Sequence, residues 1–213
     1  LEAWYPGIRG GEAIAGILFG DVNPSAKLPV TFAASENDLP HLRVPAPLGK
    51  MPGLLDGFLS TLPPFDINYT EGLKVGYKWF DAENKKSLFA FGHGLSYTDF
   101  AYTGLKVTLN RVTFTVRNTG KRAGAEIAQL YVGLPASTNE PPKRLVAREK
   151  VRLAPGESKA VSLTLDPWLL SIFDVDKDRW ELVPGDYKVY VGGSSRDTPL
   201  RGDLLIEKGQ VTK

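Results

Sequence analysis

The chain has 213 residues, 42% of them hydrophobic and 23% charged, so it is long enough and apolar enough to form a buried core. Its formal net charge is only +2, and no apolar run approaches the roughly 20 residues that cross a bilayer, so we expect no nucleic-acid or membrane partner. The absence of cysteine excludes disulfides, thiolate chemistry and zinc–thiolate sites.

The first residues have the character of a strand that is cut short. Residues 1–5 read LEAWY, which is typical of the end of a buried strand. No initiator methionine stands at position 1. We therefore expect the chain to be the C-terminal piece of a longer protein, whose earlier part supplies the start of this strand.

A helix is predicted over residues 10–20, because Ile14, Ile17 and Leu18 fall on one helical face. A short strand is predicted over residues 27–32. The order strand, helix, strand indicates an α/β layer.

Residues 33–70 are expected to form a long surface excursion, because six prolines interrupt any regular element. The acidic residues on it are expected to be solvated: Glu36, Asp38, Asp56 and Asp66. Residues 75–81 regain a strand-like aromatic pattern, in which Tyr77 and Trp79 share one face and are expected to pack in a core.

The stretch FAFGHGLSYTDF, residues 89–100, brings His93, Ser96 and Asp99 close together in sequence. Those residue types suggest a nucleophilic triad, but no strand–turn–helix elbow surrounds Ser96. The glycines on either side of His93 instead favour a sharp backbone turn. We interpret the stretch as the junction between two domains.

From residue 100 onward, short alternating strands are separated by turn signals about every ten residues. This pattern predicts an antiparallel sandwich, with Trp168 and Trp180 packed between its sheets. We therefore divide the chain into an α/β segment at residues 1–99 and an all-β sandwich at residues 100–213.

Three blocks in the first part resemble glycoside hydrolase family 3. AWYPGIRGGEAIAGILFGDVNPSAKLPVTF (3–32) is similar to the end of that family's α/β-sandwich domain. EGLKVGYKWFD (71–81) and FAFGHGLSYTDFAY (89–102) are similar to the passage into its third domain.

Three later blocks resemble the fibronectin type III-like domain of the same family, which is an immunoglobulin-type sandwich: VRNTGKRAGAEIAQLYV (116–132), LAPGES (153–158) and WELVPGDYKVYVGGSS (180–195). The blocks follow the family's order over nearly the whole chain. The resemblance therefore implies the end of the α/β domain followed by this third domain.

The resemblance also implies a retaining, exo-acting β-glycosidase, most simply a β-glucosidase, that needs no cofactor. In the family, the nucleophilic Asp lies in a barrel and the acid/base Glu in the α/β domain, and both positions precede Leu1. The implied partners are the N-terminal part of the same enzyme and a β-glucoside or oligosaccharide substrate. A periplasmic or secreted location is expected, and a homodimer is left open. The alternatives are a β-xylosidase of the same family and a non-catalytic carbohydrate-binding or scaffold module.

Within the chain, the candidate substrate-binding residues are Tyr5, Arg9 and Glu12. They belong to the loop between the first predicted strand and the helix, where open α/β layers bind ligands. Arg9 could donate paired hydrogen bonds to a sugar or a carboxylate. The alternative is a tight turn that packs against the barrel. We expect no catalytic residue here, and no metal site, because His41 and His93 are the only histidines.

Overall fold

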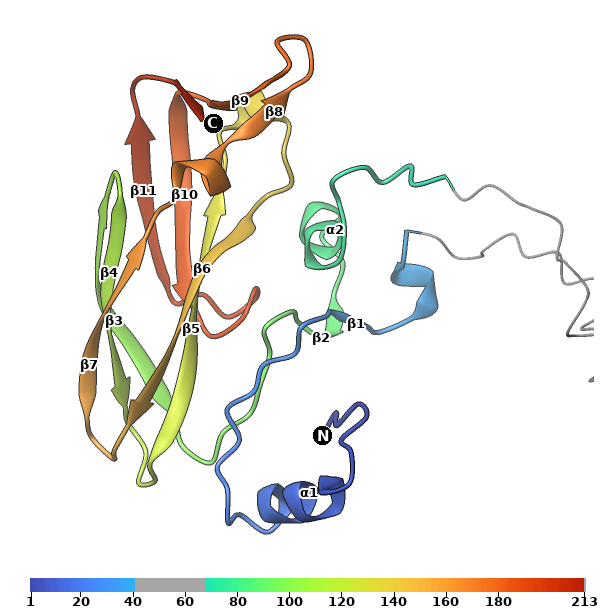
Figure 1. The fold of residues 1–213 in the computed structure, drawn as a ribbon, viewed down its shortest axis with the longest axis vertical. Helices are drawn as coiled ribbons and strands as arrows, with labels where there is room; N and C mark the ends of the chain where they lie inside the picture. Colours follow the sequence, from blue (N-terminus) through green and yellow to red (C-terminus); the bar gives the residue numbers. More distant parts are fainter. Residues whose placement is uncertain (41–67, 213) are drawn as a thin grey trace, which may run out of the picture.

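The computed structural model describes residues 1–40 and 68–212 (Figure 1). The predictions made for His41, Asp56 and Asp66 lie outside these residues. No helix in the described part of the chain is long and apolar enough to cross a membrane.

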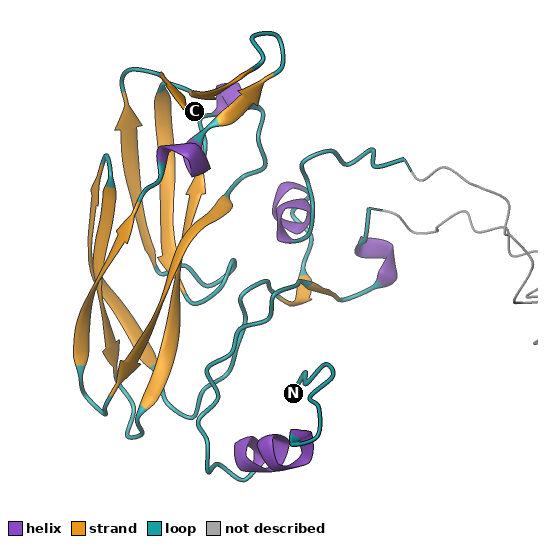
Figure 2. Cartoon of the chain, viewed as in Figure 1, coloured by secondary structure: helices purple, strands orange, loops and turns teal. Residues whose placement is uncertain are grey.

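Two antiparallel sheets form a sandwich that begins at Phe100 (Figure 2). One sheet has the order β3-β4-β7, with strands β3 (Phe100–Thr108), β4 (Arg111–Asn118) and β7 (Ser158–Thr164). The other has the order β11-β10-β5-β6, with strands β5 (Gly124–Gly133), β6 (Arg144–Leu153), β10 (Gly185–Gly192) and β11 (Leu200–Ile206). A short 3-10 turn, η2 (Ala136–Thr138), connects β5 to β6. The predicted all-β sandwich is confirmed.

Alternate residues of these strands form one hydrophobic core between the sheets. Val112, Phe114 and Val116 of β4 face inward, as their spacing of two residues predicts. Strands β5 and β10 contribute a matching row from the other sheet: Ala128, Leu130, Val132, Tyr187, Val189 and Val191. The sandwich therefore buries its own apolar surface without help from the first hundred residues.

The segment before the sandwich contains a few short elements. They are helix α1 (Gly10–Leu18), strand β1 (Phe32–Ala33), the 3-10 turn η1 (Glu36–Asp38), helix α2 (Tyr77–Ala82) and strand β2 (Ser87–Phe89). The helix predicted over residues 10–20 is confirmed as α1. Strands β1 and β2 pair antiparallel, so residues far apart in sequence lie side by side (Figure 1).

Two strand predictions in this segment are wrong or too long. Residues 1–5 form no strand, and Leu1 and Tyr5 are exposed, because nothing in the described part of the chain pairs with this stretch. The strand predicted over residues 27–32 is reduced to the last of these positions, Phe32, where β1 starts and β2 provides the hydrogen-bonding partner.

Residues 75–81 are also not a strand, because α2 begins at Tyr77. Gly76 precedes the helix with a φ of 58°, a conformation that interrupts an extended chain. Tyr77 and Phe80, three residues apart, both turn inward: the Tyr77 ring packs edge to face on Tyr131 of β5, with 5.8 Å between the centroids, and Phe80 is buried. Packing against the sandwich has thus imposed a helical period on an aromatic pattern that also fits a strand.

A third, small sheet lies at the end of the sandwich opposite α1 (Figure 1). It has the order β12-β9-β8, with β8 (Ile172–Asp174), β9 (Arg179–Leu182) and β12 (Gln210–Thr212), and the 3-10 turn η3 (Pro167–Leu170) lies next to it. Trp168 and Trp180 belong to η3 and β9, so the prediction that they pack between the two large sheets is wrong. Asp166 caps η3 by accepting a hydrogen bond from the amide of Trp168, and it is Leu170 of this turn, not Trp168, that joins the core.

Buried tyrosines should make the fold sensitive to alkali. Burial raises the pKa of the Tyr187 phenol from 10.0 to about 12, and it also raises those of Tyr102 and Tyr131. Because the folded-state pKa is the higher one, this stability is complete below pH 10 and is lost as the pH rises toward 12. The free energy of unfolding, measured with urea, should therefore fall less between pH 10 and pH 12 for Tyr187→Phe than for the wild type. The difference between the two proteins at pH 8 measures the effect of the lost hydrogen bond to Val183 alone. An identical fall in the free energy of unfolding with pH in both proteins would contradict the prediction.

Candidate docking surface

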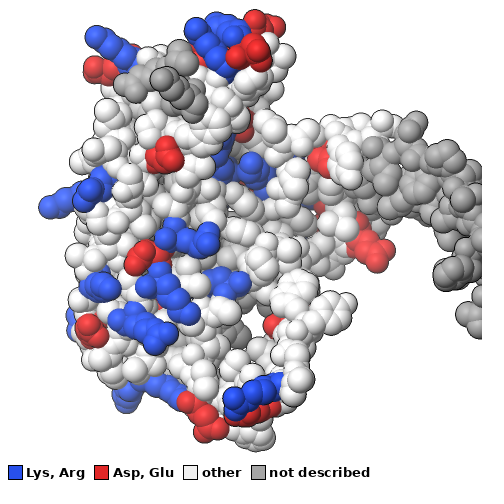
Figure 3. Space-filling model, viewed as in Figure 1, with Lys and Arg blue, Asp and Glu red and all other residues white. Residues whose placement is uncertain are grey.

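The two parts of the chain differ in how much apolar surface they bury. The sandwich has a core of its own, whereas the segment before it has almost none. Phe80 is the only fully buried hydrophobic side chain in the part of residues 1–97 that the structure describes. Large hydrophobic side chains are instead exposed throughout this segment, and those of its first 22 residues are Leu1, Trp4, Tyr5, Ile8, Leu18, Phe19 and Val22. In the view of Figure 3 this segment also shows fewer charged groups than the sandwich. An apolar surface of this kind marks a site of contact with another protein surface. We call the exposed hydrophobic side chains of this segment the docking surface.

The loop before α1 carries the residues predicted to bind substrate. Arg9 donates from Nε to Oε2 of Glu12 at 2.9 Å and from Nη2 to Oε1 at 2.7 Å. Tyr5 is fully exposed, and the ion pair is itself mostly in solvent, so it contributes little stability. The structure therefore brings Arg9 and Glu12 together and leaves Tyr5 open.

A tight turn precedes this pair. Gly7 has a φ of 72°, and its carbonyl accepts a 3.1 Å hydrogen bond from the amide of Gly10. A Cβ atom on Gly10 would overlap the ring of Pro6. The turn fixes where the Arg9 side chain leaves the backbone.

Four contacts attach this segment to the sandwich. In the first, Asn23 donates to the carbonyl of Ala123 at 2.9 Å and accepts from the amide of Tyr97 at 2.8 Å. Arg122 donates to the carbonyl of Gly20. The end of α1 is thereby held against the loop between β4 and β5.

The second contact is an ion pair within the protein interior. Lys27 Nζ lies 2.9 Å from Glu126 Oε1, and the two side chains are only 15% and 8% exposed. The Tyr102 hydroxyl donates to the same oxygen at 3.0 Å. Burial, together with the adjacent Glu126 charge, raises the pKa of Tyr102. Glu126 thus joins the N-terminal segment to both large sheets.

The third contact involves the two glycines that flank His93. Gln129 donates from Nε2 to the carbonyls of Gly92 at 3.2 Å and Gly193 at 2.7 Å. A side chain on Gly92, whose φ is 79°, would overlap the Gln129 amide, and one on Gly94 would overlap the carbonyl of Ala26. Only glycine allows these close approaches.

These same contacts show that the stretch around His93 is not a triad. The His93 ring stacks on that of Phe89, with 5.3 Å between the ring centroids. The backbone carbonyl of His93 accepts a hydrogen bond from the amide of Leu28 at 2.8 Å. Ser96 donates to Asn23 at 3.0 Å, and the Asp99 carbonyl accepts from the amide of Thr119. None of these contacts gives Ser96 a base, so the stretch is a structural junction.

The fourth contact fixes α2. The buried carboxylate of Asp81 lies 2.9 Å from Lys143 Nζ and 3.0 Å from Arg196 Nε. Arg196 also donates to the carbonyls of Phe80 and Lys85, each at 3.0 Å. The Tyr77 hydroxyl accepts from the amide of Leu145 at 2.7 Å.

Trp79, which the sequence places in a core, is half-buried and ties α2 to η1. Its indole N–H donates to the carbonyl of Asp38 at 2.8 Å, and Lys85 lies over its ring.

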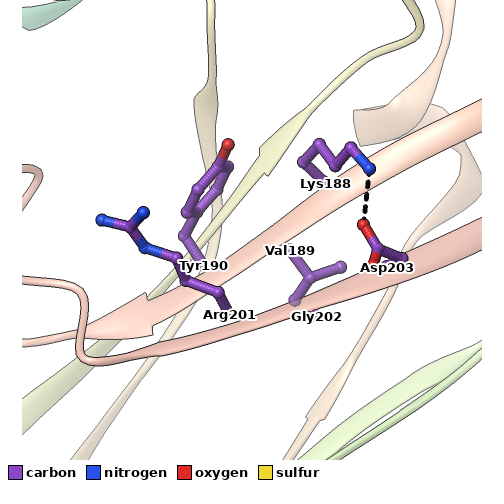
Figure 4. A pocket seen from close by; sticks show the side chains of 6 residues that line it. All are labelled: Lys188, Val189, Tyr190, Arg201, Gly202 and Asp203. Atoms are coloured by element: carbon purple, nitrogen blue, oxygen red, sulfur yellow. Dashed lines mark hydrogen bonds and ion pairs between the residues drawn. The ribbon is translucent and has the colours of Figure 1, made fainter.

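The described residues contain no cluster of three His, Asp or Glu side chains that could hold a metal ion. A shallow depression lies over β10 and β11, where Lys188 and Asp203 pair at 2.7 Å and Arg201 lies beside Tyr190 (Figure 4). The depression is open, and Lys188 and Asp203 already neutralise each other. It does not have the enclosed form of an active site.

Sequence reasoning missed the residues that make these contacts, above all Asp81, Glu126, Gln129 and Arg196. One signal was available: Glu126 and Gln129 interrupt the otherwise apolar stretch AEIAQLYV of β5. Polar residues inside such a run indicate buried hydrogen bonds, although not their partners.

Two family models match the chain: the glycosyl hydrolase family 3 C-terminal domain over residues 1–97 and the fibronectin type III-like domain over residues 126–195. Probable beta-glucosidase K of Emericella nidulans is 38% identical over 98% of this chain and 23% of its own length. Thermostable beta-glucosidase B of Acetivibrio thermocellus is 39% identical over 97% of the chain and 26% of its own length.

Solved structures give the same result. Beta-glucosidase 3B from Thermotoga neapolitana in complex with glucose superposes with a TM-score of 0.82 and is 33% identical. The superposition covers 96% of this chain and 28% of that one. The chain thus spans about a quarter of the length of the proteins it resembles.

Asp81 offers a test of how α2 is held. Asp81→Asn should lower the free energy of unfolding by about 1–3 kcal/mol, because it leaves two cations beside a neutral group. It should also speed proteolytic cleavage within residues 77–97. Asp203→Asn, which breaks the exposed pair with Lys188, is the matched control and should change neither measurement. Equal effects of the two substitutions would show that the Asp81 contact does not hold the helix.

Proposed function

Because this chain belongs to glycosyl hydrolase family 3, as the C-terminal part of such an enzyme, we propose that it completes a retaining, exo-acting β-glucosidase. Such an enzyme removes terminal, non-reducing β-D-glucosyl residues. The chain's part is to close the α/β domain of its N-terminal partner. The observation that carries this proposal is the exposed apolar surface of a segment that is firmly attached to a well-packed sandwich.

The surface is suited to an obligate partner. Ile8 and Tyr5 are fully exposed, and Phe19 is nearly so, although residues of these types are usually buried. The segment is nevertheless ordered on its other side by the contacts of Asn23 and Lys27. A surface that is held in place and left uncovered is ready to receive the preceding part of the same enzyme.

The carboxylates of the chain support placing the catalytic pair on that partner. A retaining glycosidase needs two carboxyl groups about 5–5.5 Å apart, one of them free to attack the sugar. Here Glu12 is paired with Arg9, Glu126 with Lys27, and Asp81 with Lys143 and Arg196. Each of these three carboxylates is thus already engaged by a cation.

We further propose that Tyr5, Arg9 and Glu12 lie at the rim of the sugar site. The Glu12 carboxylate holds the Arg9 guanidinium in one orientation, which reduces the entropy lost when Arg9 binds a hydroxyl group. Glucose as the sugar is supported by the relatives, which are named as β-glucosidases, and by the glucose complex of the Thermotoga neapolitana enzyme. The periplasmic or secreted location and the homodimer stay predictions.

Reconstitution tests the docking role. The isolated chain should not hydrolyse an aryl β-glucoside, and adding the N-terminal part should restore turnover. Ile8→Glu should weaken this reconstitution at least tenfold, because it buries an unpaired charge at the interface. Leu205→Glu is the control, since Leu205 is exposed on β11 of the sandwich. Strong activity of the isolated chain, or equal losses for both variants, would refute the proposal.

Arg9 tests the rim position. In the assembled enzyme, Arg9→Ala should raise KM for a β-glucoside several-fold with a smaller change in kcat, as expected when a binding contact is lost. The affinity between the two parts should stay the same. Arg148→Ala, which removes an exposed arginine from β6, provides the control. A normal KM with weakened assembly would identify the loop as a packing turn instead.

A further inference from the structure

Three aromatic side chains of η3 and the β8–β9 hairpin form a cluster. Figure 1 shows this hairpin at the end of the sandwich opposite α1. Trp168 comes from η3, and Phe173 and Trp180 face each other across the β8–β9 hairpin. The ring centroids of Trp168 and Trp180 are 4.4 Å apart, and those of Phe173 and Trp180 are 5.5 Å apart. Trp180 is therefore the centre of the cluster, between two outer rings.

The outer rings are not covered. Trp168 is 40% exposed and Phe173 44% exposed, although both pack against Trp180. Leu169 of η3 and Val175, which follows β8, add further exposed apolar surface nearby. In addition, neither Trp168 nor Trp180 donates its indole N–H to any group in the described part of the chain. The cluster thus offers apolar ring faces together with free hydrogen-bond donors.

A purely structural role explains only part of this arrangement. Packing of the hairpin accounts for Trp180, which is half-buried, but not for the exposed sides of Trp168 and Phe173. The other face of the hairpin is strongly polar, since Lys177 bridges Asp174 and Glu181, each at 2.9 Å. The hairpin therefore has one charged face, which solvent stabilises, and one face on which aromatic rings are left exposed to solvent.

We propose that the cluster of Trp168, Phe173 and Trp180 is a second, non-catalytic sugar site that binds the glucosyl chain of a β-glucan. This proposal rests on the proposed function for the class of sugar. In a β-linked glucosyl unit the hydroxyl groups are equatorial, so both faces of the ring present C–H groups that can lie on an indole. The hydroxyl groups at the ring edge can then accept a hydrogen bond from the indole N–H.

The position of the cluster supports this role. The exposed side chains of residues 1–22 lie on and around α1, and Figure 1 shows α1 and the β8–β9 hairpin at opposite ends of the molecule's long axis. A partner seated around α1 would therefore leave the hairpin accessible. Retention of a long glucan at this place would keep its chain ends near an exo-acting active site, raising their local concentration.

Native electrophoresis of the 213-residue chain in gels with and without soluble barley β-glucan tests the proposal. The wild type should be retarded, and Trp168→Ala and Phe173→Ala should each weaken retention by about fivefold to tenfold. Trp4→Ala is the matched control, because it removes an even more exposed tryptophan from the docking surface and should leave retention unchanged. Circular dichroism verifies that each variant is folded.

Three outcomes would overturn the proposal: no retention of the wild type, equal retention of the wild type and Trp168→Ala, or loss of retention only in Trp4→Ala. The assay contains no catalytic step. Failure of glucan binding is therefore separate from failure of the reconstitution that tests the proposed function. Trp168→Ala should also reconstitute normal turnover of a small aryl β-glucoside, which is too short to use the second site.

Discussion

The placement of the N-terminal segment depends on the buried ion pair between Lys27 and Glu126. Glu126 occupies a position of β5 in line with core residues Ala128 and Leu130, where an unpaired carboxylate would be costly. Lys27 must therefore reach into the sandwich, and the chain before it is held against the loop between β4 and β5. The contact defines which side of α1 faces the sandwich and which side is left for a partner.

This constraint gives the chain two kinds of stability. The sandwich has a continuous core and stabilises itself, whereas the described part of residues 1–97 takes its order from polar contacts with it. Those contacts are specific in direction, because each hydrogen bond or ion pair needs particular donor and acceptor atoms at a short distance. Exposed apolar side chains such as Ile8 and Phe19 are not specific in this way, but they supply the driving force for association. The polar contacts orient the docking surface, and the exposed apolar side chains bind the partner that covers it.

Assembly around α1 and polymer binding at the β8–β9 hairpin would then occupy opposite ends of one small protein. The docking surface is broad and aliphatic as well as aromatic, which suits another protein surface. The cluster around Trp180 is small and aromatic, with unused indole donors, which suits a sugar ring. The rigid sandwich between them keeps the two sites apart, so a glucan held at the hairpin would not compete with the N-terminal part of the enzyme.

The sequence by itself determined the features that depend on neighbouring residues. Alternation identified the strands of the sandwich, the spacing of Ile14, Ile17 and Leu18 identified α1, and the glycines beside His93 identified a turn. The tertiary structure alone decided that Tyr77–Ala82 form the helix α2 and that Trp168 and Trp180 lie outside the core. It alone decided which charges meet, since Lys27 and Glu126, or Asp81 and Arg196, are about a hundred residues apart. Local periodicity reports which face of an element is apolar, but the partner of a buried charge is fixed only when distant segments pack together.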